Sequence, residues 1–155
     1  MDKCQRGFTV VELILVVVII GILAAVVGSR FFTRSNFDER FYFEETLSAI
    51  RYAQKVAVAG GCSIQVEVRA SGTALSYFAN CGVKSSGDVV AGDHAIANPR
   101  AIKVVPDAFS VVFNSLGCVS STATCPAQGV DELQIGESSF TVKIHRATGF
   151  IEVAP

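Results

Sequence analysis

The stretch Arg6–Val27, RGFTVVELILVVVIIGILAAVV, is the most informative part of the sequence. Of the twenty residues from Phe8 to Val27, only three are not plainly apolar: Thr9, Glu12 and Gly21. At ~1.5 Å of rise per residue, the run makes about 30 Å of helix, which is the thickness of one hydrocarbon core. A carboxylate inside such a run is costly, so Glu12 is a candidate functional residue that needs a neutralising partner.

The residues that precede this run are few and polar. Residues 1–7, MDKCQRG, include Lys3 and Arg6, which favour the cytoplasmic side of a membrane. A secretory signal peptide cut near the small residues 24–26 fits this pattern, and so does an uncleaved membrane anchor. Neither interpretation explains Glu12 or the glycine that directly precedes the apolar run.

The glycine, aromatic residue and glutamate at fixed spacing resemble the class III signal of type IV prepilins and type II secretion pseudopilins. The short basic leader, Gly-Phe-Thr at residues 7–9 and Ile-Gly-Ile-Leu-Ala-Ala at residues 20–25 carry this resemblance. It implies that a prepilin peptidase cuts after Gly7 and that Phe8 becomes the N-methylated first residue. It also implies that Glu12 pairs with the N-terminal amine of a neighbouring subunit in a filament. The implied partners are other pilins or pseudopilins, the peptidase and an inner-membrane assembly platform.

The sequence departs from many type IV pilins at the end of the apolar run. Those pilins carry a proline there, whereas this chain has Val27-Gly28-Ser29-Arg30. Gly28 and Ser29 could permit a bend in the helix. The departure counts against a major pilin and leaves a minor one open.

Residues 30–59 have the pattern of a continuing amphipathic helix. Six apolar residues near helical spacing are expected to pack against a sheet: Phe37, Phe41, Leu47, Ile50, Ala53 and Ala57. The charged residues between them are expected to form a solvated face with some subunit contacts. Gly60-Gly61 predicts the end of the helix.

After Gly61 the pattern changes to the alternation that is typical of half-buried strands. We expect strands at 62–70, 73–81, 101–105, 109–114, 131–137, 139–146 and 149–154, with a loop at 84–100. Ala147-Thr148-Gly149 predicts a tight hairpin between the last two. The predicted fold class is therefore α+β, with a long N-terminal helix packed on an antiparallel sheet.

This organisation resembles the pilin fold over essentially the whole chain. IRYAQKVAVAGGCSIQVEV and KIHRATGFIEV also resemble the GspH/FimT group of minor pseudopilins and minor pilins, and MSHA-type minor pilins share the organisation. The predicted segments are a leader at 1–7, a transmembrane helix at 8–29, an amphipathic continuation at 30–60 and a periplasmic β-rich domain at 61–155.

The odd number of cysteines has a simple explanation in leader cleavage. Of the five, Cys4 lies in the leader and is removed with it, which leaves four. A hairpin that turns at Ser71-Gly72 places Cys62 opposite Cys81, and Cys118 with Cys125 closes a short loop. Four cysteines allow three connectivities, of which this is the most local. Reduced thiols are the alternative, whereas the spacings do not suit a zinc site.

The sequence offers no catalytic constellation, so we expect no enzyme activity, no cofactor and no metal. His94 and His145 are far apart and are expected to be ordinary surface residues. Asp88 and Asp93 could contribute to a calcium loop, although the match is poor. Four cations could form a small basic patch, but a solvated edge explains them equally simply: Arg100, Lys103, Lys143 and Arg146.

The sequence therefore predicts a minor pilin-like subunit of a type II secretion pseudopilus or a type IV pilus. Its expected location is the bacterial inner membrane, crossed once, with a periplasmic domain, and then the filament. The net charge of −1 does not favour nucleic acid as a partner. The alternative is a membrane-anchored periplasmic module, or a minor pilin, that binds DNA or an adhesion target.

Overall fold

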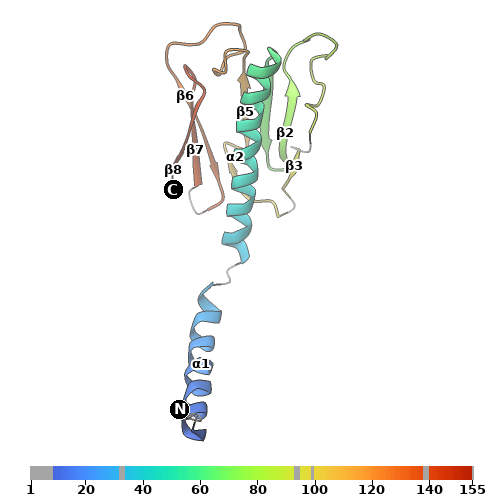
Figure 1. Ribbon diagram of the computed structural model, residues 1–155. Coiled ribbons are helices and arrows are strands. Elements are labelled where there is room, and N and C mark those ends of the chain that lie inside the picture. The colour runs from blue at the N-terminus through green and yellow to red at the C-terminus, as the bar shows by residue number, and fades with distance from the viewer. Residues whose placement is uncertain (1–8, 32–33, 93–94, 99, 138–139, 155) are drawn as a thin grey trace, which may run out of the picture. The chain divides into compact units, whose positions relative to one another are not determined.

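The computed structural model describes residues 9–31, 34–92, 95–98, 100–137 and 140–154 (Figure 1). The chain divides into two compact units, Met1–Ser35 and Asn36–Pro155. Each unit is described by itself.

The first unit contains the helix α1, Val10–Phe31. Its apolar side chains from Val10 to Leu23 are exposed, because no other element of this unit covers them. In the part of the chain that the structure describes, no helix is both long enough and apolar enough to cross a membrane. The transmembrane helix expected at residues 8–29 therefore stays a prediction.

Helix α2 is Arg34–Gly60, and the second unit begins within it, at Asn36. One face of α2 is fully buried and includes four of the six residues predicted to pack: Leu47, Ile50, Ala53 and Ala57. The helix ends at Gly60, and Gly61 follows with a positive φ of 66°, the backbone conformation that commonly terminates helices.

The prediction was wrong for two aromatic residues of α2. Phe37 and Phe41 are 74% and 57% exposed, whereas Tyr42 and Phe43 are buried in their place. Phe41 and the buried Ile50 are nine positions apart in the sequence. At about 100° per residue, this separation puts the side chains of Phe41 and Ile50 on opposite sides of the helix. Phe43 instead faces the core, where its ring centroid lies 5.0 Å from that of Phe140.

Two four-stranded antiparallel sheets lie behind α2, where the sequence predicted a single sheet (Figure 1). The first has the order β3-β2-β1-β5. Its strands are β1 Ile64–Arg69, β2 Gly72–Tyr77, β3 Ile96–Ala97 and β5 Ala108–Phe113. The second has the order β4-β6-β7-β8. Its strands are β4 Val104–Val105, β6 Val130–Ile135, β7 Phe140–His145 and β8 Phe150–Ala154.

Both sheets and α2 share one hydrophobic core. Alternate residues of β1, β5, β6 and β7 point into it, as the period of two requires, and they are almost fully buried: Ile64, Val66, Val68, Val111, Phe113, Leu133, Ile135, Val142 and Ile144. The α+β class is therefore confirmed. The predicted hairpin between β7 and β8 is also present, with His145 opposite Phe150.

The register of the first hairpin differs from the prediction by two residues. Arg69 pairs with Gly72, so Ala70 and Ser71 form the turn. Gly72 also pairs with Ala97 of β3, a strand that the sequence did not predict within the loop 84–100. A Cβ atom at Gly72 would overlap the carbonyl oxygen of Ile96. Gly72 thus starts β2 because only glycine lets β3 approach so closely.

Candidate assembly site

The N-terminal candidate site is built around the first turn of α1. Gly7 and Phe8, the predicted processing residues, lie outside the described residues. Thr9 precedes the helix, and its carbonyl oxygen accepts hydrogen bonds from the backbone N–H of Glu12 at 3.1 Å and of Leu13 at 3.2 Å. The Thr9 hydroxyl also accepts a hydrogen bond from the Glu12 N–H at 3.3 Å. Thr9 is therefore the N-cap of α1.

Glu12 is exposed in this first turn and belongs to an otherwise apolar surface. Within the described residues, its carboxylate has no ion pair or hydrogen-bond partner. The N-terminal end of a helix carries a partial positive charge, which favours a carboxylate at this position. The arrangement thus holds a negative charge near the start of α1, where a cation from outside the described chain can reach it.

The role of Thr9 is what the sequence reasoning missed. Thr9-Val10-Val11-Glu12 has the spacing of a capping box, in which a threonine N-cap is followed by glutamate at the third helical position. That pattern was available in the sequence. Within the described residues only the threonine half of the capping box is formed, because the Thr9 hydroxyl accepts from the Glu12 N–H whereas the Glu12 carboxylate has no hydrogen-bond partner.

Both predicted disulfide bonds are present. Cys62 and Cys81 have Cα atoms 5.8 Å apart, and Cys118 and Cys125 have Cα atoms 5.7 Å apart, which are usual separations for bridged cysteines. Cys62 and Cys81 lie just beyond the paired residues of β1 and β2 rather than directly opposite each other. The predicted pairing of Cys62 with Cys81 is therefore correct, although the predicted register of the hairpin is wrong by two residues.

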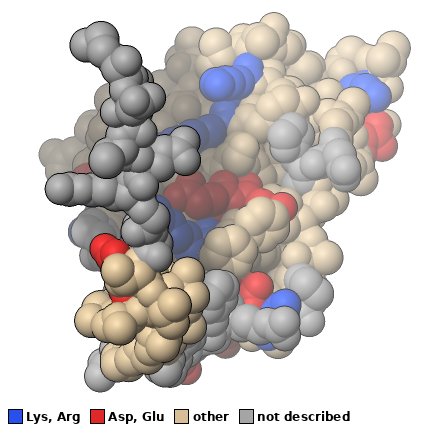
Figure 2. Space-filling model, turned by 60° about the horizontal axis from the view of Figure 1, so that its bottom comes forward, with Lys and Arg blue, Asp and Glu red and all other residues tan. Residues whose placement is uncertain are grey.

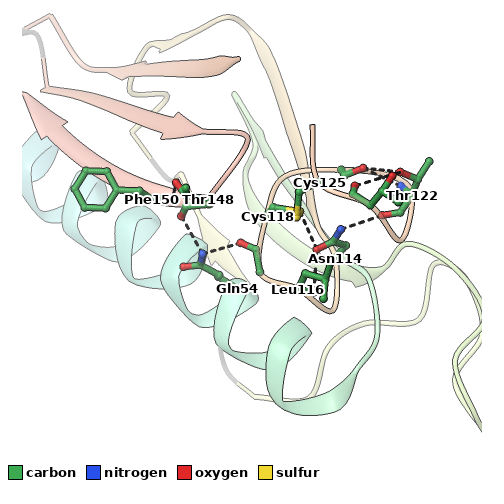
Figure 3. The surroundings of a disulfide bond; sticks show 12 residues. Gln54, Asn114, Leu116, Cys118, Thr122, Cys125, Thr148 and Phe150 are labelled. Carbon is green, nitrogen blue, oxygen red and sulfur yellow. Dashed lines mark hydrogen bonds between the residues drawn. A yellow bond between two sulfur atoms is a disulfide. The ribbon is translucent and has the colours of Figure 1, made fainter. Parts of the chain in front are cut away.

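The Cys118–Cys125 loop is fixed to its surroundings by a buried amide (Figure 3). Asn114, which is 1% exposed, donates from Nδ2 to the carbonyl oxygen of Thr122 at 3.0 Å. Its Oδ1 accepts a hydrogen bond from the backbone N–H of Leu116 at 3.0 Å. The side chain thus satisfies its polar groups by holding the loop, as a buried amide must.

Gln54 links α2 to two turns beside this loop (Figure 3). Its Nε2 donates to the carbonyl oxygen of Gly117 at 2.8 Å and to that of Gly149 at 2.9 Å. The backbone N–H of Val119 donates to the carbonyl oxygen of Arg146 at 2.9 Å. At one end of the second unit, hydrogen bonds therefore connect α2, the Cys118–Cys125 loop and the β7–β8 turn. We call these three connected segments the platform.

The cations considered as a basic patch are largely matched by acidic neighbours. Arg100 forms an ion pair with Asp38, and Lys143 lies between Glu132 and Glu152 in the register of the sheet. On the face shown in Figure 2, basic and acidic side chains are interspersed. Among the described residues, Arg100 and Lys143 therefore do not form the one-signed surface that nucleic-acid binding favours.

Arg146 is matched in the same way, by Asp131. The hydrogen bonds that Arg146 donates to the carboxylate of Asp131, followed by the charge of that carboxylate, raise the pKa of the Arg146 guanidinium above its ordinary value. Arg146 is therefore held on the surface of the sheet as half of an ion pair.

The remaining candidates from the sequence do not assemble into a site. His145 lies on β7, where its Nε2 is 3.2 Å from a carboxylate oxygen of Glu152. Asp88 accepts a hydrogen bond from the backbone N–H of Ser85 at 2.8 Å, whereas Asp93 and His94 lie outside the described residues. Within the described ranges, no group of three or more His, Cys, Asp or Glu residues could hold a metal ion.

The comparisons with known proteins bear on both units. Residues 2–28 match the prokaryotic N-terminal methylation motif, a span that includes Gly7, Phe8 and Glu12. Two crystal forms of the type IV minor pilin FimU of Pseudomonas aeruginosa match the fold with a TM-score of 0.52. The identities are 17% and 18%, and the matches cover 75% and 77% of this chain.

The chain is similar in fold to a type IV minor pilin. It carries the methylation motif of prepilin-like proteins at its N-terminus and has the pilin fold beyond it. The matches cover 92% and 90% of the two FimU chains, so the pilin-like chain shares nearly the whole of that fold. No curated protein sequence matches it significantly.

Proposed function

We propose that the chain is a non-enzymatic minor pilin-like subunit that is assembled into a helical filament. The observation that carries the proposal is the methylation motif over residues 2–28 at the start of a chain with the pilin fold. The filament is a type IV pilus or a type II secretion pseudopilus. The absence of a proline at the end of the apolar run supports a minor subunit.

Processing and membrane insertion form the first part of this proposal. Lys3 and Arg6 keep the leader in the cytoplasm, and the apolar run anchors the chain in the inner membrane. The prepilin peptidase cuts after Gly7, and Phe8 is methylated. The two disulfide bonds support a periplasmic location for the second unit, because disulfides persist in oxidising compartments.

Assembly forms the second part. The carboxylate of Glu12 pairs with the amine of methylated Phe8 on a neighbouring subunit, in the apolar surroundings that the helices of the filament provide. The exposed apolar side chains of α1 give those helices their contact surface. Because such contacts join different surfaces of successive subunits, they produce an open filament.

We expect processing to change the number of free thiols as well as the mass. When the chain is expressed with a prepilin peptidase, its intact mass should fall by residues 1–7 and rise by one methyl group. A thiol titration of the denatured, unreduced protein should then fall from one reactive thiol to none, because Cys4 leaves with the leader and the other four are paired.

The peptidase-free strain is the control for this experiment, and Gly7→Val is a matched variant that should remain unprocessed in both strains. An intact N-terminus in the presence of the peptidase would overturn the proposed processing. A cut near Ala25 would instead support a secreted or anchored binding module. Four free thiols in the processed protein would contradict the disulfide assignment.

A further inference from the structure

The two sheets have four edges, and three of them are protected. The edge strands β3 and β4 have two residues each, and Pro106 follows β4. The outer side of β5 is occupied, because the backbone N–H of Ser120 donates to the carbonyl oxygen of Val112 at 2.9 Å. Short strands, prolines and covering loops are the usual devices that stop a sheet edge from pairing with another chain.

The fourth edge, β8, is neither short nor covered by another segment within the described residues; it contains one charged residue, Glu152, and Pro155 follows it in the sequence. Phe150–Ala154 is five residues long and contains no proline, glycine or lysine. In the part of the chain that the structure describes, β7 is its one neighbouring strand (Figure 1), and the backbone N–H of Phe150 also donates to the Thr148 hydroxyl at 3.2 Å. A row of peptide groups on its outer side is therefore available to a further strand.

The apolar side chains of β8 are also incompletely covered. Val153 is 41% exposed, although Val142, its partner on β7, is fully buried. Phe150 is 61% exposed at the start of the strand. A strand added beside β8 would cover Val153 and so gain apolar contact in addition to backbone hydrogen bonds.

A groove with two cations lies beside the start of β8. Its volume is about 520 Å³, and its lining consists of Arg51, Gln54 and Lys55 from α2 and residues 148–151 of the β7–β8 hairpin. Arg51 and Lys55 are exposed and have no acidic partner within the described residues. The groove therefore favours a negatively charged occupant near Phe150.

We propose that β8 is the docking edge for an extended segment of another protein that carries carboxylates at one end. The segment adds to the second sheet as a strand beside β8, and its carboxylates lie near Arg51 and Lys55. This mode of recognition takes its affinity from main-chain hydrogen bonds and its specificity from side-chain contacts. The inference goes beyond the proposed function, because it depends neither on leader processing nor on Glu12.

The test uses the full chain in detergent micelles and three synthetic peptides. The probe is a short peptide of alternating valine and threonine that ends in two glutamates. One control peptide carries N-methyl groups on alternate backbone amides, and the other ends in two lysines. We expect the probe to bind about tenfold more tightly than either control, because each control lacks either the strand hydrogen bonds or the matching charge.

The binding site is located by amide chemical shifts and hydrogen exchange. The amides of β8 should shift, and their exchange should slow when the probe binds. Val153→Lys should weaken probe binding about tenfold, because a lysine on an edge opposes strand addition. Val130→Lys is the matched control, since Val130 is similarly exposed, at 49%, but lies on β6, which β7 separates from β8.

Thermal unfolding of the two lysine variants should match that of the parent chain, which excludes misfolding as the cause of lost binding. The proposal is overturned if the probe does not bind, if the N-methylated peptide binds equally well, or if the shifts map to another edge. Self-association of the chain that Val153→Lys abolishes would identify a second copy as the occupant and would also overturn it.

Discussion

Replacing Glu12 with leucine should remove the chain from filaments while leaving its second unit folded. In the proposed pairing, the leucine variant leaves the amine of Phe8 without its carboxylate in an apolar environment. Breaking a buried ion pair from one side costs about 3–5 kcal/mol, which corresponds to association weaker by roughly two to four powers of ten. The measurement is the amount of chain in sheared filaments relative to the membrane fraction, in cells that carry the matching assembly system.

Two variants separate the assembly role of Glu12 from its position in the capping box. Glu12→Gln keeps the size of the side chain and removes its charge, so it should assemble as poorly as Glu12→Leu. Thr9→Ala removes the N-cap, which costs only about 1 kcal/mol, so it should still assemble. If Thr9→Ala fails and Glu12→Gln assembles, capping explains the role of Glu12 and the proposed ion pair is wrong. Intact mass checks that every variant is processed equally.

The cysteines show which features the sequence could predict. Cys118 and Cys125 are separated by seven positions, so their pairing follows from short-range chain geometry. Cys62 and Cys81 belong to one hairpin, and their pairing was predicted correctly although the predicted turn was misplaced. Local pairings of this kind tolerate a shift of two residues, because such a shift keeps every side chain on the same face of the sheet.

The features that were missed depend on contacts between distant parts of the chain. Gly72 looks like a turn residue, yet it begins β2 because Ile96 of β3 lies against it. The division into two sheets has the same cause, since strand alternation shows which residues are buried but not which strands pair. Phe41 is a different kind of error, because helix geometry alone puts it on the side opposite Ile50, whereas Phe43, seven positions before Ile50, lies on the buried face and packs on Phe140.

Gly149→Ala should destabilise the second unit by about 2–5 kcal/mol. Gly149 has a positive φ of 65°, which costs an L-residue roughly 1–2 kcal/mol. A Cβ atom there would also overlap the carbonyl oxygen of Gly117 and the Nε2 of Gln54. Overpacking of this kind adds about 1–3 kcal/mol. We expect the midpoint of thermal unfolding, followed by circular dichroism of the full chain, to fall by about 10 °C.

Gly82→Ala is the matched control, because Gly82 has a similar φ of 60° but no atom within 4 Å of the added Cβ. It should show only the backbone strain, roughly 1–2 kcal/mol. The difference between the two variants therefore measures the overlap at the platform where Gln54 bonds both Gly117 and Gly149. Equal losses of stability in the two variants would mean that the platform shifts to accommodate the methyl group at little cost. The contacts of Gln54 would then not hold α2 tightly against the disulfide loop and the β7–β8 turn.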